Sequence, residues 1–345
     1  MKPLSKLFLL IGIGLVSIAV LGCSTLRKVP ASETKTEPAT KSVRLSKATV
    51  LPQVSPTIEA GQYSGITWLG DNHYAVVHDK LNGGGIVLFD IDIQPETGAI
   101  ERVSAVVPDA TRLSGVTGMD NEGITFAKGK LYVSAESDQS IREYEMDGTP
   151  TGRLLQIPEE MQRDKIFGNA GFEALTYNEV TGLFWTTTER PLPADQDTSL
   201  IHRLQSFGAD LQPAVQYLYR MDEPLRKAEG TRAYVHGISA LAALDDGRLI
   251  VLERELYVPS SVLKALNDSF ALVKLYVVDP VRSSGGVLSK QQLAAFSTTL
   301  GSLANYEGMC LGPKLSDGRQ TLLLIADSQG GMSGLTKEFL KVILF

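Results

Sequence analysis

From Val43 onward, short runs of apolar residues alternate with clusters of Gly, Asn, Asp and Lys. Runs of this length, rich in β-branched and aromatic residues and bounded by turn residues, are typical of β-strands. Three short stretches have a helical composition instead: residues 158–163, 259–267 and 289–295. The pattern therefore predicts an all-β fold with a few short helices between its strands.

The strands come in pairs, and the pairs resemble one another along the chain. In the typical pair the first strand opens with a polar residue followed by Gly or Ala, as in Glu122-Gly123, and the second closes with an acidic residue, as in Glu136. Turn residues that tolerate positive φ join the two strands. The five first strands open at Ser64, Glu122, Glu173, His236 and Glu307, and the second strands close with Asp79, Glu136, Glu189, Glu253 and Asp327.

A third strand follows every pair and a fourth follows most, which gives five units spaced about 50 to 70 residues apart. Such four-stranded units in series are the blades of a β-propeller. We predict five blades, with the N-terminal strand at residues 43–51 closing the ring, because the fifth unit lacks a fourth strand of its own. A sixth, degenerate blade, within residues 192–229 or in the long fourth repeat, stays open. A two-sheet β-sandwich is the alternative, which the regular recurrence disfavours.

The N-terminus has the pattern of a bacterial lipoprotein signal. Two lysines precede an apolar run, Leu7 to Leu21, which has the length of a signal-peptide core and ends in Gly22-Cys23. A small residue before Cys at this place resembles a lipobox. We therefore predict a signal peptide over residues 1–22 and lipidation of Cys23, with an uncleaved N-terminal anchor as the alternative.

This signal divides the chain into three parts. Residues 23–44 are polar and rich in Ser, Thr, Lys and Pro, and such a segment is predicted to be a disordered tether. Residues 45–345 are then the propeller domain, held by lipid at the bacterial cell envelope, on the periplasmic face of the outer membrane or on the cell surface. Cys310, the second of two cysteines, is expected to be a small buried apolar residue.

Charge and missing motifs exclude several functions. The chain has 33 basic and 39 acidic residues, and this acidic balance disfavours nucleic acid, whose phosphates need a basic surface. The sequence contains no Gly-x-Ser-x-Gly elbow, His-Glu-x-x-His motif, phosphate loop or Cys-x-x-Cys pair. The negative charge is compatible with binding a divalent cation, and equally with ordinary acidic solubility.

In an up-and-down blade the start of the first strand lies beside the end of the second, so the repeated acids converge at one mouth of the central channel. Packed carboxylates repel one another, and their burial is costly unless something compensates. Ca²⁺, which takes six to eight oxygens, is one compensation; paired arginines and backbone amides are the others. The predicted Ca²⁺ ligands come from Glu122, Glu136, Glu173, Glu189, Glu307 and Asp327.

Three further residues are candidates for contact with an anionic substrate. Arg190 and Arg254 directly follow the acids Glu189 and Glu253, and His236 stands where other copies have Glu. These side chains suit a phosphate or carboxylate group. For His236, a hydrogen bond to a neighbouring Glu explains the residue equally well. A carboxylate outside the metal ligands, for which we choose Glu253, is the predicted general base.

Together the stretches SGITW, DNEGITF, GFEALTY, HGISAL and YEGMCLG resemble the phytase-like domain, also called the esterase-like activity of phytase family. The resemblance covers about Val50 to Phe345, and its most specific parts are the Glu-Gly openings and the Glu-Arg pairs after second strands. It implies a secreted or surface-held propeller with phosphatase or esterase activity. The repeated acids carry over together with Arg190 and Arg254. Ser64 and His236 depart from the pattern, which favours an asymmetric site.

Two functions from different classes follow. The first is a surface-tethered, Ca²⁺-assisted hydrolase of phosphoric or other esters that acts on a small anionic or ester substrate at the acidic mouth. The second is a non-catalytic binding or scaffold lipoprotein whose acids are structural. In both we expect a monomer that binds no nucleic acid and touches the membrane through its N-terminal lipid anchor alone.

Overall fold

The computed structural model describes residues 47–58, 61–78, 85–106, 120–195, 200–328 and 336–345. The predicted signal peptide, the lipidated Cys23, the tether over residues 23–44 and Asp79 lie outside the described residues. Residues 45–345 form one compact unit. Among the described residues, no helix combines the length and the hydropathy needed to cross a membrane.

The named strands form five antiparallel sheets of four strands each. The first sheet contains β2 (Tyr63–Gly70), β3 (His73–His78), β4 (Gly85–Ile93) and β5 (Ile100–Val106). The second contains β6 (Asn121–Ala127), β7 (Lys130–Ala135), β8 (Ser140–Tyr144) and β9 (Pro150–Leu154). The third contains β10 (Phe172–Asn178), β11 (Leu183–Thr188), β12 (Ile201–Phe207) and β13 (Pro213–Arg220).

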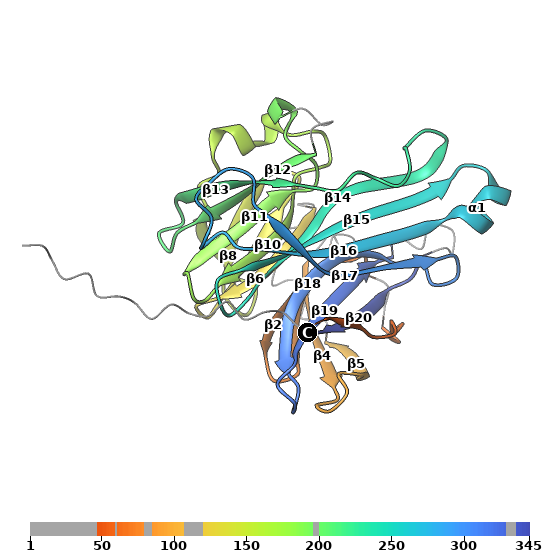
Figure 1. Ribbon diagram of the computed structural model, residues 1–345. Coiled ribbons are helices and arrows are strands. Elements are labelled where there is room, and N and C mark those ends of the chain that lie inside the picture. The colour runs from red at the N-terminus through yellow and green to blue at the C-terminus, as the bar shows by residue number, and fades with distance from the viewer. Residues whose placement is uncertain (1–46, 59–60, 79–84, 107–119, 196–199, 329–335) are drawn as a thin grey trace, which may run out of the picture. The chain divides into compact units, whose positions relative to one another are not determined.

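The fourth sheet contains β14 (Thr231–Ala243), β15 (Leu249–Pro259), β16 (Phe270–Val278) and β17 (Lys290–Thr299). The fifth contains β18 (Asn305–Lys314), β19 (Gln320–Asp327), β20 (Phe339–Leu344) and β1 (Thr49–Val50). The first strands of neighbouring sheets, β2, β6, β10, β14 and β18, contact one another in a closed ring, in which β18 contacts β2 (Figure 1). The predicted five-bladed β-propeller is therefore confirmed.

Two details of the prediction have different outcomes. Residues 192–229 supply strands β12 and β13 of the third blade, so the alternative of a sixth blade there is wrong. The N-terminal strand is short, and β1 pairs with β20 through Thr49 and Val50 at the outer edge of the fifth blade. Closure of the ring by an N-terminal strand over residues 43–51 stays a prediction, since residues 43–46 lie outside the described part of the chain.

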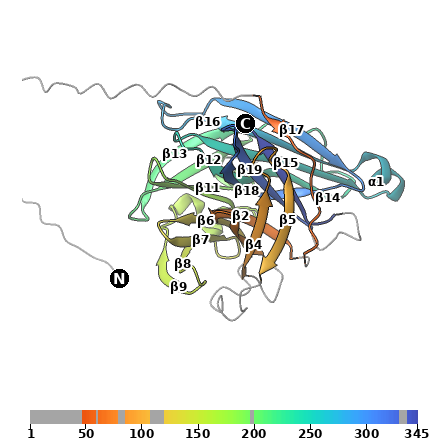
Figure 2. The same cartoon turned by 90° about the horizontal axis from the view of Figure 1, so that it is seen from below.

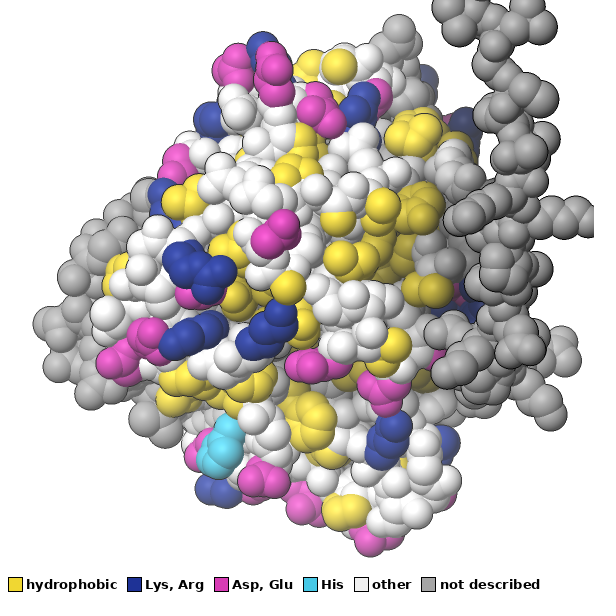
Figure 3. Space-filling model, turned by 90° about the vertical axis from the view of Figure 1, so that its left-hand side faces the viewer, with side chains coloured by type: hydrophobic (Ala, Val, Ile, Leu, Met, Phe, Trp, Pro, Cys, Tyr) yellow, Lys and Arg dark blue, Asp and Glu magenta, His cyan; other side chains and the backbone are white. Residues whose placement is uncertain are grey.

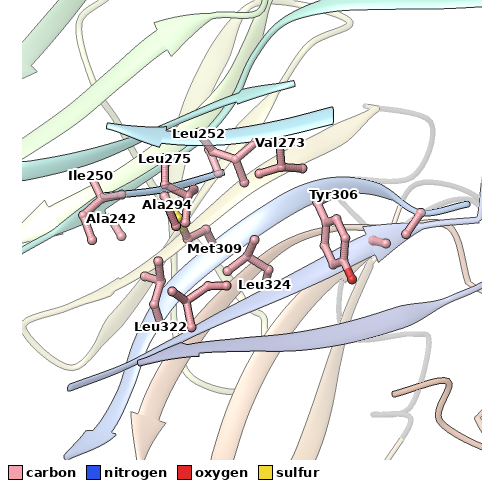
Figure 4. Packing of buried hydrophobic residues seen from close by; sticks show 14 of the residues in the cluster. Ala242, Ile250, Leu252, Val273, Leu275, Ala294, Tyr306, Met309, Leu322 and Leu324 are labelled. Carbon is pink, nitrogen blue, oxygen red and sulfur yellow. The ribbon is translucent and has the colours of Figure 1, made fainter. Parts of the chain in front are cut away.

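Burial decreases from the inside of each blade to its outside. Every residue of β10 is buried, whereas β9 at the outer edge of its blade is mostly exposed. Between neighbouring blades, the faces of the sheets pack apolar side chains against each other. Figure 4 shows this between the fourth and fifth blades, where Leu252 and Leu275 meet Met309, Leu322 and Leu324. Each blade therefore depends on its neighbours for a hydrophobic core.

The helices are short. They are η3 (Glu159–Met161), η4 (Arg163–Lys165), η5 (Pro193–Asp195) and α1 (Val262–Asp268). Two of the three stretches of helical composition contain helical turns, but the helix expected at residues 289–295 is wrong, because that segment forms most of β17. There the ladder with β16, from Phe270↔Thr299 to Val278↔Lys290, outweighs the helix propensity of Gln and Ala.

The ends of the first strands opposite the acidic residues enclose a cavity of about 630 Å³, whose walls include Trp68, Tyr177 and Leu311. Cys310 also lies there as a buried free thiol, as predicted, and burial raises its pKa.

Seen from the left-hand side of Figure 1, acidic and basic side chains are interspersed with hydrophobic ones (Figure 3). Charge of one sign is therefore not concentrated on that visible face.

Candidate functional site

A cavity of about 780 Å³ lies at the mouth of the channel where the first strands begin. Six acidic side chains line it together with three basic or titratable ones: Asp120, Glu122, Glu173, Glu189, Glu307, Asp327, Arg190, Arg254 and His236. The predicted convergence of these residues from different blades is therefore present. Of the other two predicted residues, Glu136 lies against Asp120 and Glu122, and Glu253 lies outside this cavity.

A β-bulge positions a polar residue in each first strand, near the start of the strand in four blades and farther along in the fourth. The regular pairing is interrupted between Asn121 and Ile124, and again between Phe172 and Ala174. An extra residue in one strand redirects a side chain, and bulges often lie next to functional sites. In the five blades the residues at the bulges are Ser64, Glu122, Glu173, Ser239 and Glu307.

The fourth blade differs from the predicted alignment by three residues. Its bulge lies between Ile238 and Ala240, so the equivalent of the glutamates is Ser239 and not His236. The Ser239 hydroxyl donates a hydrogen bond to the Tyr306 carbonyl at 3.1 Å, which connects the fourth blade to the fifth. His236 instead belongs to a part of β14 that continues beyond the ring, and from there it lines a wall of the cavity.

The second strand of the fourth blade is also shifted, by one residue. In the third blade, Thr188 pairs with Phe172, the residue before the bulge, and Glu189 follows Thr188. In the fourth blade, Glu253 pairs with the residue before the bulge and is therefore equivalent to Thr188. Since successive side chains of a strand point to opposite faces, a shift of one residue exchanges the faces. The residues that share the position facing the channel are Glu136, Glu189, Arg254 and Asp327.

Glu253 consequently points away from the channel. Its Oε1 accepts hydrogen bonds from Lys290 Nζ at 2.6 Å and from the Tyr219 hydroxyl, and its Oε2 accepts one from the Asp222 amide at 3.1 Å. The side chain is buried within this network. The structure therefore corrects the choice of Glu253 as general base, because a base at that place does not reach a substrate in the cavity.

Arg254 occupies the position that is acidic in the other described second strands. Its Nη2 lies 2.6 Å from Glu189 Oε1 and 3.5 Å from Glu173 Oε2, and its Nη1 pairs with Glu307. Burial lowers the pKa of this guanidinium, but the three carboxylates outweigh burial and hold the pKa well above its ordinary value. Arg254 was expected to bind a substrate anion; in the structure it compensates the carboxylates of two neighbouring blades.

A second group of acids lies on the other side of the ring, where Arg254 makes no ion pair. One oxygen each of Asp120, Glu122 and Glu136 lies within 4.8 Å of the others. Glu136 is only 1% exposed; its Oε1 accepts the Gly171 amide, and its Oε2 has no hydrogen-bond partner among the described residues. Burial raises the pKa of Glu136 to about 7, and the charges of Glu189 and Asp120 add to this effect.

Glu173 lies between these two groups. Burial raises the pKa of Glu173 well above its ordinary value, and the charges of Glu122 and Glu189 raise it further, whereas Arg254 opposes the rise. Burial is the largest cause of this shift, so Glu173 holds its proton more tightly than an exposed carboxyl does, even beside Arg254.

The lining of the acidic cavity also contains residues suited to an anion. The Arg190 guanidinium stacks over the Phe167 ring, 4.6 Å from its centroid, and it lines the cavity. Strand β14 adds Tyr234 and His236 from its extension beyond the ring. Arginine and histidine side chains donate charge-assisted hydrogen bonds to phosphate and carboxylate oxygens.

The glycines next to the acidic positions allow the first strands to touch. A Cβ added at Gly308 would lie 2.3 Å from the Ser64 carbonyl oxygen, and one added at Gly65 would lie 2.5 Å from the Glu122 carbonyl oxygen. Behind the acids, the space enclosed by the first strands measures only about 10 Å³, room for about one water molecule. The cavity therefore has a floor, and the Glu-Gly motif serves the construction of the ring as well as the site.

One ligand candidate was not predicted. Asp120 directly precedes β6 and adopts a left-handed backbone with φ of 51°, and its carbonyl oxygen accepts the Glu136 amide at 2.8 Å. Asp and Asn tolerate this conformation, so the pair Asp120-Asn121 before a strand was the available signal. Ser239 was missed for another reason, because His236-Gly237-Ile238 imitates the Glu-Gly-Ile pattern three residues earlier.

These features define the protein as a five-bladed β-propeller with a carboxylate-rich cavity at one mouth. The chain belongs to the Phytase-like family, described as esterase-like activity of phytase, whose model matches residues 58–329. The resemblance seen in the sequence is thereby confirmed. A comparison with curated proteins found no match.

Several solved structures are similar over most of their length. Myxococcus xanthus glutaminyl cyclase is 13% identical with a TM-score of 0.41, and the match covers 86% of this chain and 96% of that one. A Bacteroides thetaiotaomicron endo-arabinase is 13% identical with a TM-score of 0.45, covering 84% and 95%. The PQQ-bound aldose sugar dehydrogenase of Streptomyces coelicolor is 13% identical with a TM-score of 0.43, covering 86% and 98%.

Proposed function

We propose that this protein is a divalent-cation-dependent hydrolase of small anionic esters, phosphoric esters above all, and that Ca²⁺ binds at Asp120, Glu122 and Glu136. The observation that carries the proposal is the buried Glu136 Oε2, which has no hydrogen-bond partner among the described residues and lies in a cluster of three carboxylates. The family description, esterase-like activity of phytase, supports the class of substrate.

The donor set fits a hard cation. All three side chains offer carboxylate oxygens, and one oxygen of each lies within 4.8 Å of the others, which suits a cation that takes oxygen ligands alone. Zinc favours nitrogen and sulfur donors instead. A cation here would also give Glu136 Oε2 the partner that the described protein groups do not provide.

The other residues of the cavity have separate proposed roles in binding the substrate, accepting a proton and positioning the acids. When bound, the cation would polarise the ester and lower the pKa of a coordinated water. Arg190 and His236, which also line the cavity, would hold the anionic group of the substrate. Glu173 replaces Glu253 as the proposed proton acceptor, because it lines the cavity and its raised pKa makes its carboxylate a stronger base than that of an exposed glutamate. Arg254 would fix the positions of Glu189 and Glu307 through its ion pairs.

Calorimetric titration with Ca²⁺ and release of product from phosphomono- and diesters test the proposal together. Asp120→Asn is a suitable variant because Asn also tolerates the left-handed backbone at this position. We expect it to lose Ca²⁺ binding and turnover, while Glu101→Gln, a change at an exposed acid in β5, retains both. Ca²⁺ binding without turnover of any ester would favour the non-catalytic binding protein, and no Ca²⁺ binding would favour a scaffold.

We also propose that the domain is held at the bacterial cell envelope by lipid on Cys23. The sequence pattern before this residue supports the proposal. Replacement of Cys23 by Ser should move the protein from the membrane fraction to the soluble fraction of lysed cells. Retention of the variant in the membrane fraction, with the predicted signal peptide still present by mass spectrometry, would favour an uncleaved anchor.

A further inference from the structure

The fourth blade extends past the ring on the side of the acidic cavity. Strands β14 and β15 run through 13 and 11 residues, and the ladder from Thr231↔Pro259 to His236↔Glu255 lies beyond the bulge at Ser239. Helix α1 follows directly after β15. Both ribbon views show the end of this hairpin and α1 projecting past the other strands (Figures 1 and 2).

Helix α1 presents apolar side chains to solvent. Leu263 is 76% exposed, Val262 75% and Leu266 53%, and the first two are the most exposed large hydrophobic side chains among the described residues. None of the seven residues of α1 is buried. Single exposed apolar residues are ordinary on protein surfaces, but three within one short helix form a patch.

The helix is nevertheless fixed to the blade. Ala265 packs against the cluster that contains Leu256 and Val258, and the Ser269 hydroxyl donates a hydrogen bond to the Ala265 carbonyl at 2.7 Å. The exposed residues therefore lie on the side of α1 that the blade does not use. Packing within the domain does not account for their apolar character.

Basic residues occur in α1 itself and in the segment beside the end of the hairpin. The segment 225–232 runs beside the end of the hairpin: the Ser260 amide donates to the Gly230 carbonyl at 3.0 Å, and the Tyr234 hydroxyl donates to the Arg226 carbonyl at 2.9 Å. Residues 225–232 and 260–268, here called the tip, contain four basic and two acidic residues, in a chain with more acidic than basic residues. The four basic residues, all exposed or partly exposed, are Arg226, Lys227, Arg232 and Lys264.

We propose that the tip is a membrane-contacting element, in which Val262, Leu263 and Leu266 enter the interface of a bilayer while the basic side chains contact anionic headgroups. Apolar insertion beside Lys and Arg is the physical basis of peripheral helix binding to anionic membranes. The charge also argues against a second copy as the occupant, because two apposed tips would bring like-charged basic residues together. This contact is additional to the expected lipid anchor.

Vesicle co-sedimentation tests the proposal with residues 24–345, which lack the lipidation site and contain every described residue. The vesicles consist of phosphatidylcholine alone or with phosphatidylglycerol added. We expect binding to the anionic vesicles, reduced by about tenfold or more in the variant Val262→Ser/Leu263→Ser, since each large apolar side chain contributes appreciably to insertion. Lys264→Glu should weaken binding to the anionic vesicles only.

The matched control is Val180→Ser, which changes a side chain that is 64% exposed at the turn between β10 and β11. It should bind vesicles like the unchanged protein. Equal sedimentation of the unchanged protein and the α1 double variant would overturn the proposal. So would sedimentation-velocity data in which the unchanged protein self-associates without lipid and the double variant is a monomer, because the occupant would then be a second copy.

Discussion

The substitution Glu136→Gln separates the burial of a carboxylate from its use as a ligand. The change keeps the shape of the side chain and its oxygen for the Gly171 amide, but it removes the charge. In the folded protein without a cation, burial raises the pKa of Glu136 from an ordinary 4.5 to about 7. The folded state therefore holds this proton more tightly than the unfolded state does.

The sign and size of the effect follow from this raised pKa. The stability contributed by the proton is complete below the unfolded pKa of 4.5 and is lost as the pH rises through about 7. At about 1.4 kcal/mol for each pKa unit, the loss amounts to about 3 kcal/mol at about pH 8. Because Gln carries no charge, Glu136→Gln in EDTA should be more stable than the unchanged protein by about 3 kcal/mol, or by about 6 °C in Tm.

Scanning calorimetry from about pH 4 to about pH 8, with EDTA or with Ca²⁺, measures both effects. Below about pH 4.5 the two proteins should have the same stability. At about pH 8, Ca²⁺ should raise the Tm of the unchanged protein and of the exposed control Glu101→Gln, but not that of Glu136→Gln. A gain that is equal at both ends of the pH range would refute the ionisation argument. A variant that Ca²⁺ still stabilises would show that the cation binds elsewhere.

Three other changes test the ring and the wall of the cavity. Gly308→Ala places a Cβ 2.3 Å from the Ser64 carbonyl oxygen and should lower the free energy of unfolding, measured in urea, by about 2 kcal/mol. The control Gly168→Ala places its Cβ in open space and should change the free energy of unfolding little. Arg254→Met leaves three buried glutamates without their ion-pair partner and should cost about 3 to 5 kcal/mol by calorimetry. An unchanged Tm would contradict its neutralising role. Arg190→Ala should raise KM for a phosphomonoester about tenfold at constant Tm, and a fall in kcat alone would contradict a role in binding.

The blades could be predicted because their strands and turns are determined by residues that are close together in the sequence. A pair such as β10 and β11 has β-branched and aromatic residues in both strands, and the turn between them contains Gly182 with a positive φ. Five such pairs leave few architectures other than a propeller. The convergence of acids at one mouth then follows from topology alone, and the structure places six of them around one cavity.

The register of the fourth blade could not be predicted in the same way. Alternation shows which residues share a face, but it does not show where a bulge interrupts the ladder. The extension of β14 and β15 allowed His236 and Glu253 to imitate the pattern of the other blades, although Ser239 and Arg254 occupy the equivalent positions. The helix expected at residues 289–295 failed for a related reason, since pairing with a distant strand decided its conformation.

The floor of the acidic cavity limits the passage of small molecules through the central channel of the propeller. Because the first strands approach closely at the glycines and enclose a space of only about 10 Å³, we expect that molecules larger than water do not pass from one mouth of the channel to the other. Substrate would enter and product would leave by the same opening. An anionic product such as phosphate would then compete directly with the next substrate for Arg190 and His236. Inhibition by product should therefore be competitive, with an increase in KM and no change in kcat.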